Sequence, residues 1–324
     1  MAGPRRNPSG DRLWEYALVA DARPMKSRRA MVCHAGAIEA ARCPGGGMAT
    51  FGSGLFCIYA AGSGTAGLYY LCMRLRLIRH ATLTIEYNGH KLIIDPMLDE
   101  AGARPPIQNS PNPRKNPLVP LPIPVAEVLE GVEAVLVTHT HSDHWDATAA
   151  ELLGKSLPLF GQIEDQAKFR SQGFGAAQAV RESAVWNGIE IVRTDGQHGR
   201  GEIGKAMAPV SGFVLRASGE PTLYIAGDTI WCGEVQDALR EHRPAVVVVN
   251  AGAAQFLEGD PITMTADDVI ATCQAAGASK VVAVHMEAIN HCLLTRADLG
   301  FQLEAARVEK AEIPGDGEWV ESGV

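Results

Sequence analysis

Three histidines and an aspartate follow an apolar segment in a pattern that could bind a metal ion. Residues 135–137 read Val-Leu-Val, as in a buried β-strand, and His139, His141, Asp143 and His144 follow in the order His-x-His-x-Asp-His. In an extended chain successive side chains alternate between two faces, so His139 and His141 project to the same side. Neutral imidazole and carboxylate are ligands that suit zinc, manganese and iron. We therefore expect four potential ligands at the C-terminal end of one strand.

The alternative for any single histidine is an ordinary core or surface position. That alternative is weak for this segment, because three imidazoles and a carboxylate would be costly to bury without a cation that satisfies them. The spacing therefore favours a metal site over a purely structural cluster.

This segment resembles, residue for residue, the second motif of the metallo-β-lactamase superfamily of metallohydrolases. Further motifs stand in that family's order: His198 in the glycine-rich segment 195–201, Asp228 in a Gly-Asp-Thr sequence, and His285 after an apolar segment. A Gly-Asp-Thr sequence alone is more often a turn or a helix cap, but its place after the other motifs favours a ligand. The resemblance covers about residues 73–320.

The resemblance implies a binuclear metal site with an open position for water on each ion, which is typical of catalytic sites. Water on such an ion has its pKa lowered towards about 7, and the hydroxide attacks a carbonyl or phosphoryl centre. Asp143 would also orient this water or accept its proton. We expect two divalent ions, zinc in the first place, with manganese or iron, and a single ion, as alternatives. The implied ligands are His139, His141 and His198 for the first ion, Asp143, His144 and His285 for the second, and Asp228 as the bridge.

The expected reaction is hydrolysis of a small ester, lactone or phosphodiester. The continuation Trp145-Asp146 resembles the branch that contains ascorbate-6-phosphate lactonase and the phospholipase D acting on N-acylphosphatidylethanolamine. Asn250 and His291 are expected substrate contacts, although His291 could instead cap a helix or replace His285 as a ligand. A mononuclear iron oxidoreductase of the same fold, acting on persulfides, is the alternative enzyme. A non-catalytic metal-binding protein is disfavoured, because none of the implied ligands is missing.

The predicted elements bring these residues to strand ends. Asn88-Gly89 joins two alternating segments and favours a type I′ hairpin turn. The resemblance implies an α/β (α+β) fold: a four-layer αββα sandwich of two mixed β-sheets with helices outside and the site at one edge. Strands are expected at residues 74–79, 83–87, 91–94, 157–160, 189–193, 212–217, 222–226, 245–249 and 280–284, and helices at 126–129, 147–153, 164–171, 234–242, 265–276 and 296–306.

Two residues near the motifs have a functional and a structural interpretation. Asp95 follows a predicted strand and could orient a ligand imidazole, or could be an ordinary turn carboxylate. The same two interpretations apply to His80, which resembles a histidine in the opening strand of some family members. Residues 96–124 are rich in proline, so we expect a loop there that forms a wall or flap over the site.

Composition indicates a soluble α/β protein. The chain has 324 residues, and its net charge of −8 argues against a general nucleic-acid binder, which would normally be basic. Its 7 cysteines are scattered and form no Cys-x-x-Cys pair, so we expect a reducing, cytoplasmic compartment. The expected partner is a small-molecule substrate, without nucleic acid or membrane, and a homo-oligomer is left open.

Residues 1–72 differ in composition from the domain expected at 73–324. Segment 43–72 contains no charged residue, and residues 51–72 are long enough to span a bilayer, but this stretch is too rich in glycine to favour a membrane anchor. We expect a disordered extension, or a reading frame that is too long and a natural start at Met73. The intact mass of the protein from its own host distinguishes these two, because a full-length mass contradicts the second.

Overall fold

The computed structural model describes residues 48–51, 54–61, 65–70 and 73–321. The chain divides into two compact units, Met1–Leu71 and Cys72–Val324. In the first unit, three strands form an antiparallel sheet in the order β1-β2-β3. The other residues of this unit lie outside the described ones, so both hypotheses about the extension stay predictions. The strands are β1 (Met48–Phe51), β2 (Gly54–Ala61) and β3 (Thr65–Tyr70).

The first sheet of the second unit has seven strands in the order β17-β4-β5-β6-β7-β8-β9. Strands β4, β5 and β6 are antiparallel neighbours, whereas β6, β7, β8 and β9 are parallel. The sheet is therefore mixed, as predicted. The strands are β4 (Arg74–Arg79), β5 (Thr82–Tyr87), β6 (His90–Ile94), β7 (Ala134–Val137), β8 (Leu159–Gly161), β9 (Ala177–Ala179) and β17 (Trp319–Glu321).

The second sheet also has seven strands, in the order β10-β11-β12-β13-β14-β15-β16. Strands β10 to β13 are antiparallel neighbours, and β13 to β16 are parallel. This sheet is mixed too. The strands are β10 (Ser183–Trp186), β11 (Ile189–Asp195), β12 (Ser211–Arg216), β13 (Leu223–Ile225), β14 (Val246–Asn250), β15 (Lys280–Val284) and β16 (Ala311–Glu312).

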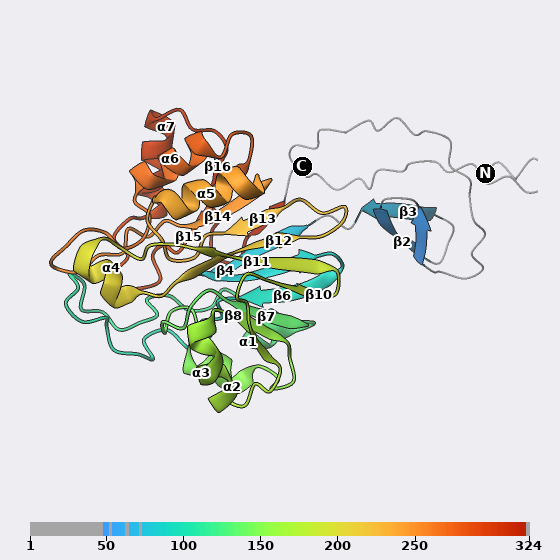
Figure 1. The fold of residues 1–324 in the computed structure, drawn as a ribbon, viewed down its shortest axis with the longest axis horizontal. Helices are drawn as coiled ribbons and strands as arrows, with labels where there is room; N and C mark the ends of the chain where they lie inside the picture. The colour runs from blue at the N-terminus through green and yellow to red at the C-terminus, as the bar shows by residue number, and fades with distance from the viewer. Residues whose placement is uncertain (1–47, 52–53, 62–64, 71–72, 322–324) are drawn as a thin grey trace, which may run out of the picture. The chain divides into compact units, whose positions relative to one another are not determined.

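Helices cover the outer face of each sheet (Figure 1). Apolar side chains of α1, α2 and α3 pack on the first sheet, and those of α5, α6 and α7 pack on the second. The αββα sandwich expected from the sequence is confirmed. The helices are α1 (Val125–Leu129), α2 (Ala147–Leu152), α3 (Gln166–Ser171), α4 (Gly201–Met207), α5 (Gly233–His242), α6 (Ala266–Ala275) and α7 (Arg296–Ala305).

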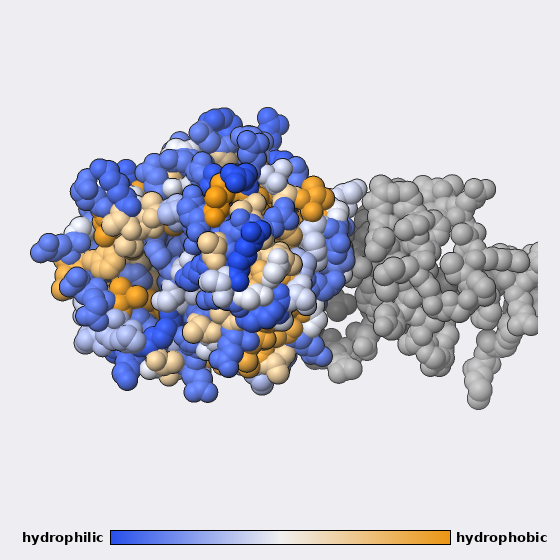
Figure 2. All heavy atoms as spheres, turned by 60° about the horizontal axis from the view of Figure 1, so that its bottom comes forward, coloured by the Kyte–Doolittle hydropathy of each residue, from blue (hydrophilic) through white to orange (hydrophobic). Residues whose placement is uncertain are grey.

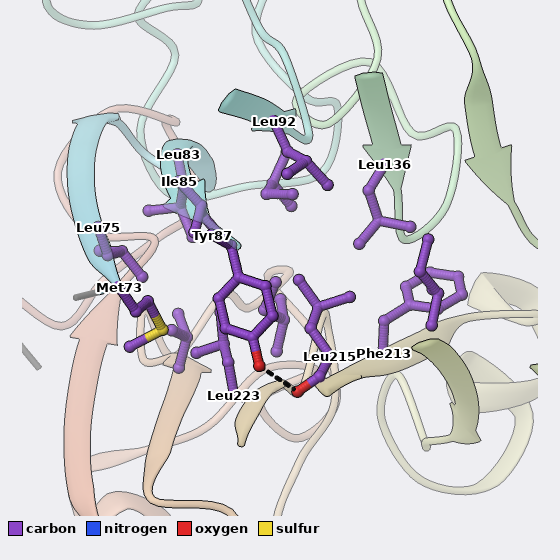
Figure 3. Close-up of a cluster of buried hydrophobic side chains, with 14 of the residues drawn as sticks. Met73, Leu75, Leu83, Ile85, Tyr87, Leu92, Leu136, Phe213, Leu215 and Leu223 are labelled. Carbon is purple, nitrogen blue, oxygen red and sulfur yellow. Dashed lines mark hydrogen bonds between the residues drawn. The ribbon is translucent and has the colours of Figure 1, made fainter. Parts of the chain in front are cut away.

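The central core lies between the two sheets, where alternate side chains of both face each other (Figure 3). Tyr87 crosses this layer from the first sheet, and its hydroxyl can donate to the carbonyl of either Leu215 or Pro221, which lie at 3.0 and 2.9 Å. A buried hydroxyl with partners avoids the cost of an unsatisfied polar group. The core thus holds the two sheets in a fixed relation, on which the site at their edge depends.

Strand directions explain why the motifs meet. Strands β4, β6 and β7 run parallel to one another, and so do β11, β13, β14 and β15. Their C-terminal ends therefore gather at one edge of each sheet. Every sequence motif singled out above follows one of these ends.

The predicted hairpin turn is confirmed, since Asn88 and Gly89 both have positive φ, of 51° and 77°. The proline-rich segment contains no helix or strand between β6 and α1. Strands β9, β10, β16 and β17 and helix α4 were not predicted. Most of these are only two to four residues long, and none of the residues of α4 is buried, so hydrophobic periodicity is too short or absent there.

Exposed large hydrophobic side chains are scattered over the described surface. On the face shown in Figure 2, hydrophobic residues form small separate groups within a largely hydrophilic surface. Within the described residues, no helix has the length and apolar character needed to cross a membrane. The exposed large hydrophobic residues are Leu152, Val185, Leu257, Leu293, Phe301 and Trp319.

Removing residues 1–72 is expected to leave metal binding and turnover unchanged, because every predicted ligand lies among residues 73–321. The measurement compares metal content and turnover of the full chain with those of a chain that starts at Met73. An insoluble or inactive shortened chain would show that the extension belongs to the fold.

Candidate metal centre

The structure brings all seven predicted ligands together at the joint edge of the two sheets. Four of them follow β7, and one each follows β11, β13 and β15. His141 is half-buried and the other six are buried. Their ligand atoms form overlapping groups in which all atoms lie within 4.8 Å of one another.

The first group is His139, His141 and His198, the set predicted for the first ion. Nε2 of His139 lies 2.9 Å from Nδ1 of His141. His198 approaches from the other sheet and is held by a contact of 2.8 Å between its Nδ1 and the carbonyl of Ile262. This contact leaves Nε2 of His198 directed to the centre, where it lies 3.3 Å from the carboxylate of Asp228.

The second group contains Asp143, His144 and His285, as predicted, together with His80. Nε2 of His285 lies 3.3 Å from Nε2 of His144 and 3.7 Å from Oδ2 of Asp143. His285 has a φ of 72°, a left-handed conformation that is uncommon for a residue with a Cβ atom. It follows the last residue of β15, so the chain turns sharply where the side chain must reach the centre.

Asp228 lies between the two groups. Its Oδ2 is 3.3 Å from both His144 and His198, and its Oδ1 is 3.2 Å from His285. The preceding Gly227 has a φ of 69°, and a Cβ atom there would lie 2.6 Å from the carbonyl of Ser211. Glycine is therefore required for the turn that places Asp228 in the position predicted for a bridging carboxylate.

The donor set fits divalent cations. The nitrogens of His144 and His285 face each other at 3.3 Å, and two buried carboxylates stand among imidazoles. Burial would raise the pKa of Asp228, but the facing imidazoles of His285 and His144 lower it well below its usual range. The carboxylate is thus ionised, and ionised carboxylate with neutral imidazole is a ligand set for zinc, manganese or iron.

Asp95 orients the second group, one of the two roles considered for it. Its Oδ2 lies 2.8 Å from Nδ1 of His144 and accepts from the hydroxyl of Thr138 at 2.7 Å, while its Oδ1 accepts from the Thr138 amide at 2.7 Å. A carboxylate on the second nitrogen of a ligand imidazole fixes its tautomer and ring orientation. Asp95 therefore supports a predicted ligand, His144, without being one itself.

The two predicted substrate contacts occupy different places. His291 lines the cavity beside the centre, and burial lowers its pKa to about 4. The amide of Asn250 instead donates to Oδ1 of Asp228 at 2.6 Å. Asn250 is not among the described residues that line the cavity, and its role in substrate binding stays a prediction.

A cavity of about 210 Å³ opens onto the centre. None of the described residues that line it is a lysine or an arginine. A larger hollow of about 850 Å³ surrounds Arg243 and Lys310 at the opposite ends of β14 and β15, away from the ligands. The cavity at the centre is lined by Ile107, His141, Ser142, Asp143, His198, Met207, Asp228, Phe256, Ile262 and His291.

The proline-rich segment forms a wall of this cavity through Ile107. Asn290 holds the segment: its side-chain oxygen accepts from the amide of Ile107 at 2.9 Å and from the side chain of Asn116 at 2.7 Å. Its side-chain nitrogen donates to the carbonyl of Asn112 at 2.6 Å and to the hydroxyl of Ser110 at 2.5 Å. These contacts support the wall rather than the flap of the earlier expectation.

Replacing Asn290 by alanine is expected to raise KM about tenfold, with kcat changed less. Tenfold corresponds to ~1.4 kcal/mol, about the net value of one or two hydrogen bonds lost from a wall that touches substrate. Steady-state kinetics measures both constants, with Gln108→Ala, an exposed position of the same segment, as the control. An unchanged KM would show that this wall does not contribute to substrate binding.

Comparisons with known proteins show the family to which the chain belongs. Residues 90–286 match the Beta-lactamase superfamily domain. The chain is 38% identical over 250 residues to the UPF0173 protein YddR of Bacillus subtilis, covering 76% of this chain and 98% of that protein. A UPF0173 metal-dependent hydrolase of Azorhizobium caulinodans is 27% identical over 190 residues, 56% of this chain and 73% of that protein.

Two solved structures are similar over nearly their whole length. An isothiocyanate hydrolase from Delia radicum gut bacteria is 40% identical, with a TM-score of 0.73, over 76% of this chain and 98% of that chain. A possible metal-dependent hydrolase from Veillonella parvula is 33% identical, with a TM-score of 0.75, over 78% and 99%. The chain therefore belongs to the beta-lactamase superfamily, in the UPF0173 family of metal-dependent hydrolases. The narrower branch expected from Trp145-Asp146 stays a prediction.

Proposed function

We propose that this metal-dependent hydrolase holds two divalent ions and cleaves a small uncharged substrate with an apolar substituent. The observation that carries the proposal is the cavity beside the ligand cluster, where Ile107, Met207, Phe256 and Ile262 line one small space with the metal-facing residues. A substrate seated against these side chains would place its reactive carbon beside Asp143. When bound, the ions would supply Lewis acidity and lower the pKa of water.

The cavity favours neutral substrates over phosphodiesters. Recognition of a phosphoryl group usually employs arginine or lysine, and neither lines the described cavity. Arg104 lies outside this cavity, in an adjoining hollow, where it pairs with Asp99 at 2.7 Å and donates to the carbonyl of Ser142 at 2.6 Å. Among the expected substrates we therefore prefer esters and lactones to phosphodiesters.

An isothiocyanate is a further candidate substrate. The support is the 40% identity to a structure described as an isothiocyanate hydrolase, together with the apolar lining. Water would add to the central carbon of R–N=C=S with transfer of a proton to nitrogen. The resulting thiocarbamic acid would break its carbon–nitrogen bond to give an amine and carbonyl sulfide.

Asp143 and His291 would have different roles in the reaction. The pKa of Asp143, which burial would raise, is held well below its usual range by His144 and His80, so this carboxylate is ionised and can accept a proton from water. His291 is neutral at pH 7, since burial lowers its pKa to about 4. A neutral imidazole offers one donor and one acceptor to a substrate heteroatom.

The experiment compares turnover of benzyl isothiocyanate, a p-nitrophenyl ester, a γ-lactone and bis(p-nitrophenyl) phosphate by the metal-loaded protein. We expect one of the three neutral classes to be turned over, and the phosphodiester to be the poorest substrate. Asp143→Asn, which cannot accept the proton, is the control for adventitious hydrolysis. Preferred turnover of the phosphodiester would contradict the proposal.

Elemental analysis of protein purified without added metal or chelator tests the ions themselves. We expect about two zinc or manganese per chain, because the two ligand groups share only the central Asp228 in the proposed arrangement. Predominantly iron, at about one per chain, would favour the mononuclear oxidoreductase instead.

A further inference from the structure

His80 lies outside the seven predicted ligands but inside the second ligand group. It is fully buried, and its Nε2 lies 3.1 Å from Oδ2 of Asp143. Its ring stands against that of His285, with 3.6 Å between ring centroids and 35° between ring planes. One side chain therefore contacts two of the three residues predicted to hold the second ion.

The main chain of His80 supports the same group. The amide of His285 donates to the carbonyl of His80 at 2.9 Å, so the left-handed turn at His285 is fixed by a residue of the other sheet. His80 itself has a φ of 62°, and it follows a register shift between Leu77 and Arg79 in the pairing of β4 with β5. Such conformations persist only where the surroundings hold them.

The tautomer of His80 follows from its contacts. A proton on Nε2 can be donated to the Asp143 carboxylate, whereas a bare Nε2 would set two lone pairs against each other. Nδ1 of His80 is buried and has no hydrogen-bond partner among the described residues. An unprotonated Nδ1 needs no acceptor, so the form with the proton on Nε2 suits both nitrogens.

We propose that His80 is a positioning residue for the second ion. It donates from Nε2 to Oδ2 of Asp143, and its ring and carbonyl fix His285. The contact with His80 restricts the orientation of the Asp143 carboxylate. The inference rests on the binuclear centre of the proposed function, but it concerns metal affinity and not the substrate.

The test is a titration of the metal-free full chain with zinc against a competing chromophoric chelator. His80→Asn tolerates positive φ but is too short to reach Asp143, and His80→Gln can place its amide nitrogen near the Nε2 position. We expect His80→Asn to weaken the second ion by about tenfold to a hundredfold, with the first ion unaffected, and His80→Gln to recover most of the loss. His90→Ala, at an exposed contact with Glu133, is the control.

The possible results of this titration test the positioning role of His80 and the binuclear centre separately. Equal loss in His80→Asn and His80→Gln would overturn the role of the hydrogen bond from Nε2 to Asp143. A binuclear wild type with unaffected variants would overturn this role alone, whereas a wild type that binds one ion would overturn the binuclear centre with it. Circular dichroism of each metal-free variant confirms that the fold compared is the same.

Discussion

Asp228→Ala is expected to release metal and reduce turnover to the uncatalysed level. The carboxylate lies between both ligand groups, 3.3 Å from His144 and His198 and 3.2 Å from His285. Its loss removes the negative charge that lies between the facing imidazoles. Removing one preorganised group from such a site costs about 10²–10³ in kcat, and loss of an ion adds to this. Metal content and turnover of the purified variant measure the effect.

Asp195→Ala is the matched control for this variant. Asp195 ends β11 and pairs with Arg193 at the surface, so its removal takes away a carboxylate without touching the centre. Unchanged metal content and activity in Asp228→Ala would refute the assignment of the bridge.

Asp95→Ala is expected to lower metal affinity about tenfold to a hundredfold, although Asp95 is not a ligand. The change removes the partner of Nδ1 of His144 and the acceptor of two buried donors of Thr138. Loss of such an orienting contact typically has this effect on affinity, and each unpaired buried donor costs about 1–3 kcal/mol of stability. Zinc titration and thermal unfolding measure the two effects separately.

Asp95→Asn distinguishes orientation from general damage. The asparagine oxygen can still accept from the Thr138 amide, whereas its nitrogen cannot accept from His144. We expect stability to recover more than metal affinity. A variant that binds zinc as tightly as the wild type would show that His144 needs no such partner.

The sequence reveals ligands that directly follow strongly apolar strands. His139, His141 and His285 follow apolar runs that are buried throughout, and a run of that kind predicts a buried strand directly. The direction of Asn250 could not be read, because a strand end fixes where the backbone lies but not which neighbour takes the side-chain amide. The roles of Asp95 and His80 depend on pairing between segments far apart in the chain.

One missed element had a readable signal. Asn187-Gly188 joins β10 to β11 with positive φ at both residues, 48° and 77°, and it has the same turn sequence as Asn88-Gly89. Strand β10 could therefore have been predicted from its turn. Helix α4 has no comparable signal, since it begins at a glycine and buries none of its residues.

Each ion would draw ligands from both sheets. The first takes His139 and His141 from the end of β7 and His198 from the end of β11, and the second takes its ligands from β7 and β15 in the same way. Metal binding is therefore coupled to the docking of one half of the sandwich on the other. By mass action, free metal at 100 times its Kd would add about 2.7 kcal/mol to the free energy of unfolding. In a cell, the metal supply would then set not only the activity of this protein but also its lifetime.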